Sequence, residues 1–253
     1  MLTRRLIVCL DVKDGRVVKG TNFRQLRDVG DPCSMSVDYE RQGADELVFL
    51  DISATSEERA TLLDVARQTA ERLFIPLTIG GGIRTAEDVA LALRSGADKV
   101  SLNSAAVATP TLLTDAADRF GAQCVVASID VRRHGDRWRV YTHGGKRETE
   151  HDAIEWAARC VDLGAGEILL TSIDRDGVRR GYDLELTRKV ATEVNVPVIA
   201  SGGASDPASI VAAMVDGAAD AALVAGILHD RVTTVQAIKS EMARAGLPVR
   251  EAA

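Results

Sequence analysis

The chain has 253 residues, the usual size of an eight-fold β/α barrel, and can bury well over half of the surface that it exposes when unfolded. Its hydrophobic fraction of 46% and charged fraction of 27% are those of an ordinary soluble globular protein. The net charge of −6, from 31 basic and 37 acidic residues, gives no indication of a general nucleic-acid binder.

Short apolar runs rich in β-branched residues alternate with longer amphipathic stretches along the chain. Strands are predicted at residues 6–11, 47–51, 76–80, 99–103, 124–130, 167–171, 197–201 and 220–225. Helices are predicted at residues 34–42, 57–73, 86–95, 110–120, 152–163, 183–194, 206–216 and 232–245. This alternation indicates right-handed parallel βαβ units, which either close into a barrel or form an open doubly wound sheet.

An internal repeat favours the barrel. Segment 6–12 resembles 125–131, segment 46–52 resembles 167–173, and segment 76–82 resembles 197–203, each pair about 120 residues apart. An open sheet would have distinct edge strands and no reason for such regular duplication. The sequence therefore predicts an α/β fold with one domain over residues 1–253, a single (β/α)₈ TIM barrel whose half-barrels span about 1–121 and 122–253.

Cysteines and histidines show no metal-binding spacing. The four cysteines (Cys9, Cys33, Cys124, Cys160) lack a C-x-x-C pair, and the four histidines (His134, His143, His151, His229) are scattered. We therefore expect no protein-built metal site and no cofactor. The first residues lead straight into a strand, and no apolar run approaches the ~18 residues of a membrane span. These features predict a cytoplasmic protein with reduced thiols.

Two aspartates end strands that correspond in the repeat. Asp11 ends the first strand and Asp130 the fifth, and the two-residue strand period directs both into the barrel. An aspartate is tolerated there only at the mouth, where solvent or substrate meets it. Two carboxylates that flank one substrate suit general acid–base catalysis, and the alternative is that each caps the turn that follows it.

Glycines follow two other corresponding strands, at Gly80-Gly81-Gly82 and Gly202-Gly203. Glycine allows close approach of a ligand, and its N–H groups can bind phosphate oxygens. The next strand in each half ends at Asn103-Ser104 or Ala225-Gly226, and the second pair opens a short turn that could face an anion. Unless the glycines only make tight turns, the repeat predicts two phosphate sites and a ligand with a phosphate at each end.

Long connections follow the first and fifth strands, at residues 13–31 and 132–149. Connections of this length in a compact barrel are usually lids or binding segments, and the second contains a predicted hairpin at residues 134–136. In the first, Lys19 is either a mobile cation that reaches a substrate anion or a solvated surface lysine. After the sixth strand, Asp176 and Gly177 lie near the second phosphate position.

Four charged residues begin barrel strands: Arg5, Glu46, Lys99 and Glu167. The strand period directs Arg5 inward, and it places Lys99 on the face of Asn103 and Glu167 on the face of Thr171. Charges in so confined a place persist when they pair with one another. We expect an ion-pair ring that closes the barrel floor, either as a structural plug or as a gate.

With these residues assembled, the sequence closely resembles the cyclase-subunit family of imidazole glycerol phosphate synthase, from residue 1 to about residue 230. The resemblance rests on segments 9–23, 46–51, 80–83, 96–100 and 170–177. It implies condensation of ammonia with a bis-phosphorylated ribulosyl aminoimidazole-carboxamide nucleotide to give imidazole glycerol phosphate and an aminoimidazole carboxamide ribotide. It assigns catalysis to Asp11 and Asp130. It assigns substrate or phosphate contacts to Lys19, Gly82, Asn103, Ser104, Thr171, Asp176, Gly177, Gly202, Gly203, Ala225 and Gly226.

The resemblance also implies a partner, a separate glutaminase subunit docked on the barrel floor. It makes Arg5, Glu46, Lys99 and Glu167 a gate that passes ammonia into the barrel. The chain departs from the family at Gly226, where a serine is usual, and at Leu228, where an aromatic residue is usual. The missing hydroxyl removes one side-chain contact to the second phosphate.

Two other functions remain open at this stage. The sister isomerase of the same pathway is also a duplicated half-barrel with two aspartates and two phosphate sites, and it needs no ammonia. Segment 19–23 and the complete floor ring favour the cyclase. The other alternative is a non-catalytic phosphate-ligand-binding barrel subunit, which the two aspartates disfavour.

Overall fold

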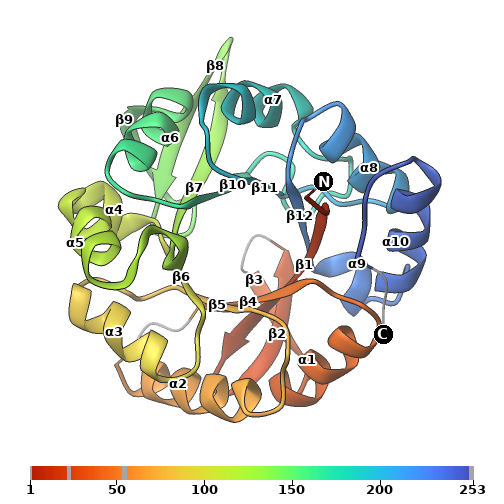
Figure 1. The fold of residues 1–253 in the computed structure, drawn as a ribbon, viewed down its shortest axis with the longest axis horizontal. Helices are drawn as coiled ribbons and strands as arrows, with labels where there is room; N and C mark the ends of the chain where they lie inside the picture. Colours follow the sequence, from red (N-terminus) through yellow and green to blue (C-terminus); the bar gives the residue numbers. More distant parts are fainter. Residues whose placement is uncertain (1, 22–23, 53–55, 251–253) are drawn as a thin grey trace.

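Eight parallel strands close into a barrel in the computed structural model, which describes residues 2–21, 24–52 and 56–250 (Figure 1). The barrel strands are β1 (Arg5–Lys13), β4 (Glu46–Asp51), β5 (Leu77–Gly80), β6 (Lys99–Leu102), β7 (Val125–His134), β10 (Glu167–Ser172), β11 (Val198–Ser201) and β12 (Ala221–Val224). Each pairs with the next, and the ring closes where β12 pairs with β1. The predicted TIM barrel is confirmed, and its internal repeat stays a prediction.

Helices surround the barrel (Figure 1). They are α1 (Pro32–Arg41), α2 (Ser56–Ala70), α3 (Ala86–Arg94), α4 (Ser104–Ala108), α5 (Thr111–Phe120), α6 (Ala153–Asp162), α7 (Leu184–Glu193), α8 (Pro207–Val215), α9 (Gly226–His229) and α10 (Val235–Arg244). Asp or Thr side chains cap the N-termini of α1, α3, α6, α7, α8 and α10, which fixes where these helices begin.

Apart from shifts of one to three residues at the ends of other elements, three details differ from the prediction. Helix α4 was not predicted, and α9 replaces a predicted turn, because helices of five and four residues are too short to show a 3.6-residue period. Cys124 was predicted in a strand but ends the 3₁₀ turn η1 (Ala122–Cys124), and β7 begins one residue later.

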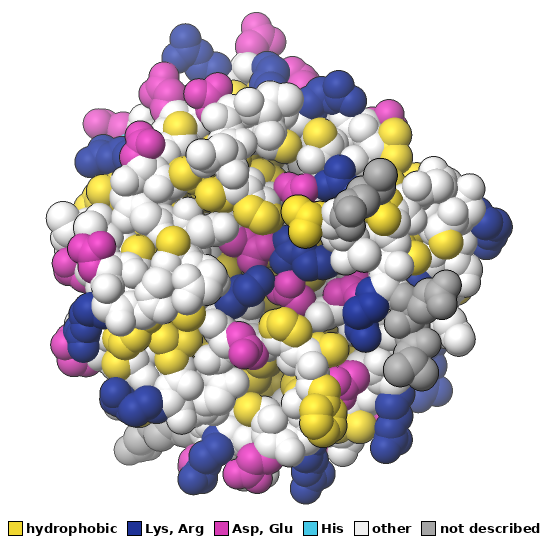
Figure 2. Space-filling view, in the orientation of Figure 1, with side chains coloured by type: hydrophobic (Ala, Val, Ile, Leu, Met, Phe, Trp, Pro, Cys, Tyr) yellow, Lys and Arg dark blue, Asp and Glu magenta, His cyan; other side chains and the backbone are white. Residues whose placement is uncertain are grey.

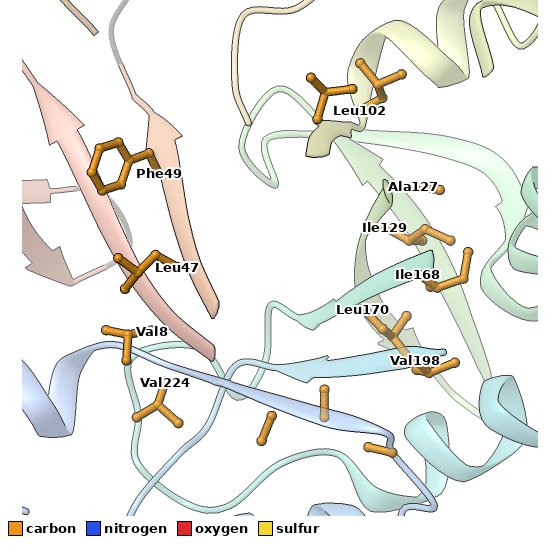
Figure 3. Close-up of a cluster of buried hydrophobic side chains, with 14 of the residues drawn as sticks. Val8, Leu47, Phe49, Leu102, Ala127, Ile129, Ile168, Leu170, Val198 and Val224 are labelled. Atoms are coloured by element: carbon orange, nitrogen blue, oxygen red, sulfur yellow. The ribbon is translucent and has the colours of Figure 1, made fainter. Parts of the chain in front are cut away.

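Alternate residues of each strand pack on opposite sides of the barrel wall. In β1, Leu6, Val8 and Leu10 belong to the large core between strands and helices, whereas Ile7 and Cys9 belong to a smaller cluster inside the barrel. Figure 3 shows the outer layer, in which Val8 lies among side chains from several other strands. This alternation directs Asp11 into the barrel mouth.

Two β-hairpins extend the barrel at the carboxyl ends of β1 and β7. After β1, β2 (Arg16–Thr21) and β3 (Arg24–Gly30) fill the predicted lid segment, and β2 pairs antiparallel with β1. After β7, β8 (Arg137–Thr142) and β9 (Arg147–Asp152) form the second extension, and the predicted hairpin turn is confirmed, since His134 pairs with Arg137. Among the described helices, none has both the length and the apolar character needed to cross a membrane.

Candidate active site

Three aspartates share the carboxyl end of the barrel. Asp11 comes from β1, Asp130 from β7, and Asp176 from the segment after β10. Burial, and next the charge of Asp176, raise the pKa of both Asp11 and Asp130 to about 7. Burial also raises the pKa of Asp176, and a hydrogen bond from the backbone of Gly177 opposes this. Because the charge of Asp176 raises the pKa of both other carboxylates, Asp176 lies near each of them at this end of the barrel.

Asn103, directly after β6, contacts one of these aspartates. Its Nδ2 donates to Oδ2 of Asp130 at 2.8 Å, which lowers the pKa of Asp130 and partly offsets the effect of burial. Its Oδ1 is buried and has no hydrogen-bond partner among the described residues. A buried amide oxygen without a partner is costly, so Asn103 presents an acceptor that suits a substrate hydroxyl or N–H group.

The first predicted phosphate position lies at the ends of β5 and β6. Gly81 and Gly82 have φ angles of 88° and 64°, and a Cβ on Gly81 would lie 2.2 Å from the backbone oxygen of Asp51. Only glycine fits there. Helix α4 then begins at Ser104, whose Oγ accepts a hydrogen bond from the backbone N–H of His143 at 2.9 Å. The second hairpin therefore reaches this position.

The second position lies at the ends of β11 and β12. Gly202 and Gly203 have φ angles of 83° and 114°, and a Cβ on Gly203 would lie 2.3 Å from the backbone oxygen of Gly181. Helix α9 follows Ala225, which has φ −134° and ψ −77°, close to the −119° and −88° of Asn103 before α4.

The two short helices α4 and α9 therefore begin in the same way at the two positions. Among the described residues, neither N-cap side chain accepts a hydrogen bond from its own helix. The first N–H groups of each helix are left to bind another acceptor.

Asp176 and Gly177 follow β10, the sixth strand of the barrel. Thr171 is half-buried in β10 and pairs in register with Asp130. Gly177 has a φ of 73°, and its backbone N–H donates to Asp176. Thr171 therefore lies on the β7–β10 side of the barrel, and the place of Asp176 and Gly177 near the second phosphate position stays a prediction.

Lys19 lies at the second position, joined to residues that the sequence reasoning missed. Its Nζ donates to the backbone oxygen of Gly226 at 3.2 Å and to the carboxylate of Asp230. Arg27 and Arg179 also donate to Asp230. The only signal in the sequence was an acid four residues after the Gly226 turn, which spacing alone does not distinguish from a surface carboxylate.

His229 fixes α9 to the barrel. Its Nε2 lies 3.0 Å from the backbone oxygen of Cys9 and its Nδ1 lies 2.7 Å from the Tyr39 hydroxyl. Burial, more than any other cause, lowers the pKa of His229 to about 4, so the ring is neutral near pH 7. The neutral ring donates from Nε2 and accepts at Nδ1, and this holds the turn before Asp230 in place.

The four charged residues at the amino ends of the strands form a closed ring. Arg5 donates to Glu46 and Glu167 at 2.6 Å each, and Lys99 donates to the same two carboxylates at 2.9 and 2.8 Å. The glutamate side chains are only 8% and 6% exposed. Burial lowers the pKa of Arg5 and Lys99, but the two glutamates outweigh it and raise both pKa values.

The predicted floor ring therefore has alternating charges with every carboxylate oxygen engaged. Figure 2 shows basic and acidic side chains side by side at the centre of the face in view. Above the ring, the barrel interior is lined by mainly apolar side chains: Ile7, Cys9, Val48, Val126, Leu169, Ile199, Ala221 and Leu223. Within the described part of the chain, no group of three or more His, Cys, Asp or Glu residues is arranged to hold a metal ion.

Comparison with known proteins places this arrangement in a family. The family model described as "Histidine biosynthesis protein" matches residues 5–234. The chain is 68% identical over 250 residues to "Imidazole glycerol phosphate synthase subunit HisF" of Myxococcus xanthus, with 99% of both chains covered. The chain belongs to the HisF family. Proteins of the same name from Dehalococcoides mccartyi and Methanocaldococcus jannaschii are 54% and 53% identical, again over 99% of each chain.

Membership of the HisF family confirms the resemblance seen in the sequence. The chain is an enzyme of histidine biosynthesis, of the cyclase-subunit type of imidazole glycerol phosphate synthase. The sister isomerase and the non-catalytic subunit are thereby set aside. The family name does not assign roles to individual residues.

Proposed function

We propose that this HisF protein condenses ammonia with a bis-phosphorylated ribulosyl aminoimidazole-carboxamide nucleotide. The products are imidazole glycerol phosphate and an aminoimidazole carboxamide ribotide. The observation that carries this proposal is the pair of carboxylates, Asp11 and Asp130, whose pKa values are both raised to about 7 at the mouth of one barrel. A group whose pKa lies near the working pH serves best in proton transfer, because it both gives and accepts protons readily.

Coupling between the carboxylates supplies an acid and a base together. When one carboxyl of a buried, interacting set ionises, its charge raises the pKa of the others. Near pH 7 the mouth therefore holds protonated and ionised carboxyls at the same time. One aspartate moves protons on the ketose and the incoming nitrogen, and the other assists ring closure and departure of the ribotide.

Binding of the substrate at both ends would hold the reacting atoms between these carboxylates. Gly81, Gly82 and the start of α4 form one anion position, and Gly202, Gly203 and the start of α9 form the other. Phosphates bind well to backbone N–H groups at such turns. Oδ1 of Asn103, for which the described residues offer no hydrogen-bond partner, suits a donor in the middle of the substrate. The amide nitrogen of the same side chain contacts Asp130.

Ammonia would reach the mouth from the opposite end of the barrel, supplied by a glutaminase subunit. The charged ring of Arg5, Glu46, Lys99 and Glu167 closes that end, since both cations contact both carboxylates. A ring with every ion pair formed leaves no opening, so one side chain has to swing aside. Docking of the partner at this face would drive that movement if the partner binds the open arrangement of the ring more tightly.

The test is an assay for consumption of the ribulosyl substrate that depends on added ammonium salt. We expect turnover by the wild-type protein and a loss of at least ~10²-fold in Asp130→Asn, the size expected for lost acid–base catalysis. Circular dichroism and ligand binding would show that the variant folds. Wild-type-like rates in the variant, or turnover of the preceding ribosyl isomer without ammonium, would contradict the proposal.

A further inference from the structure

Three cations from separate segments meet one carboxylate at the carboxyl end of the barrel. Asp230 follows α9, and its Oδ2 accepts hydrogen bonds from Lys19 on β2 and from Arg179 in the segment between β10 and α7. Its Oδ1 accepts a hydrogen bond from Arg27 on β3. One side chain therefore joins the first hairpin and the segment after β10 to the turn that follows β12.

Asp230 separates charges that would otherwise repel. Lys19 and Arg27 are directly opposite in the antiparallel pairing of β2 and β3, and like charges in this arrangement destabilise a sheet. The Lys19 and Asp230 side chains are 22% and 23% exposed, whereas Arg27 is 59% exposed and Arg179 40%. Solvent screens the more exposed pairs most, so Lys19 is the group that Asp230 holds most firmly.

The cations held in this way lie beside Gly226, the first residue of α9, which follows β12. Lys19 and Arg179 each also donate to the backbone oxygen of Gly226, at 3.2 and 3.3 Å. A Cβ on Gly226 would lie 3.3 Å from Nζ of Lys19 and 3.9 Å from the nearer terminal nitrogen of Arg179. The two cationic groups therefore occupy the space beside Gly226 into which a longer side chain would extend.

We propose that Asp230 is a positioning residue that holds Lys19 and Arg179 beside the Gly226 turn, where the two cations bind the substrate phosphate. This inference rests on the proposed function. Three cations and one carboxylate leave two positive charges, which match the charge of a phosphate monoester, about −1.5 to −2 near pH 7. Without the carboxylate, mutual repulsion would move the cations apart.

The test compares Asp230→Asn, which keeps the shape and removes the charge, with the wild-type protein. We expect the KM for the ribulosyl substrate to rise about tenfold, the effect of losing one hydrogen bond between charged groups, while kcat stays within about threefold. Amide hydrogen exchange in β2 and β3 should accelerate about tenfold without substrate. Asp230→Glu restores the charge and should recover most of both effects.

Asp28→Asn is the matched control. Asp28 pairs with Arg16 at 2.9 Å within the same hairpin, and both side chains are about half exposed. Removing the charge of Asp28 should therefore leave KM unchanged. An unchanged or lower KM in Asp230→Asn would overturn the inference, and a lower value would show that the carboxylate competes with phosphate. Unchanged hydrogen exchange would also overturn it.

Binding of inorganic phosphate, measured by calorimetry, separates the two proposals. If the wild-type protein does not turn over the ribulosyl substrate, the proposed function fails. A weaker affinity of Asp230→Asn for phosphate would still support the positioning role of Asp230, and an equal affinity would refute it.

Discussion

Replacing Asp11 with asparagine should make the protein more stable and less active, with a stability gain that depends on pH. The carboxyl has a pKa of about 7 in the folded chain against 3.8 ordinarily, mainly because burial disfavours its charge. The folded state therefore binds this proton more tightly than the unfolded state does. The stability that results is complete below about pH 4 and is lost as the pH rises through about 7.

The size of the stability gain follows from the difference between the folded and the ordinary pKa of Asp11. A difference of about 3 pKa units corresponds to an upper limit of about 4 kcal/mol, since each unit is worth about 1.4 kcal/mol. Asp11 is half-buried at an open mouth and shares its shift with Asp176, so we expect about half of this, ~2 kcal/mol. Asparagine cannot ionise and avoids this loss at every pH.

Urea unfolding of Asp11→Asn and the wild-type protein, at about pH 4.5 and about pH 8.5, measures this difference. The variant should gain ~2 kcal/mol more at the higher pH than at the lower, and its turnover should fall at least ~10²-fold. Asp115→Asn, on the exposed surface of α5, is the control and should show neither change. A stability difference that does not vary with pH would refute the reasoning, as would a variant less stable than wild type at about pH 8.5.

Two further substitutions test the other end of the barrel. Lys99→Glu reverses one charge of the floor ring. We expect it to reduce glutamine-dependent turnover, measured with the proposed glutaminase partner, more than ammonium-dependent turnover. Equal losses in both assays would indicate a structural plug. Lys239→Met removes three hydrogen bonds of the buried ammonium group. They join it to the backbone oxygen of Gly43 at 2.7 Å, to the Asp45 carboxylate at 2.7 Å and to the backbone oxygen of Arg250 at 2.8 Å. The substitution should lower the free energy of unfolding by ~3 kcal/mol. An unfolding midpoint equal to wild type would contradict that estimate.

The barrel could be predicted because its signals are local and repeated. Strand periodicity placed Asp11 and the floor ring correctly on the inner face, since alternation along a strand is independent of what lies across the barrel. The paired glycines were also identifiable, because a φ above zero beside another backbone excludes other residues.

The cluster around Asp230 could not be predicted from sequence. Its members come from β2, β3, the segment after β10 and the turn after α9, and no periodicity connects residues so far apart. The raised pKa values of Asp11 and Asp130 could not be predicted either, since they depend on burial and on a third carboxylate, Asp176. Sequence identified which groups lie at the mouth, and three-dimensional contact determines how they act on one another.

Closure of the barrel between β12 and β1 has a consequence for biosynthesis. The register joins Arg5 to Ala221 and Val8 to Val224, so the first strand of the barrel keeps an unpaired edge until the last barrel strand is synthesised. An open strand edge is a template for association with other chains, and such long-range pairing is slow to form. Nascent chains of this protein are therefore most exposed to aggregation just before synthesis of β12 is complete, when a chaperone would protect them most.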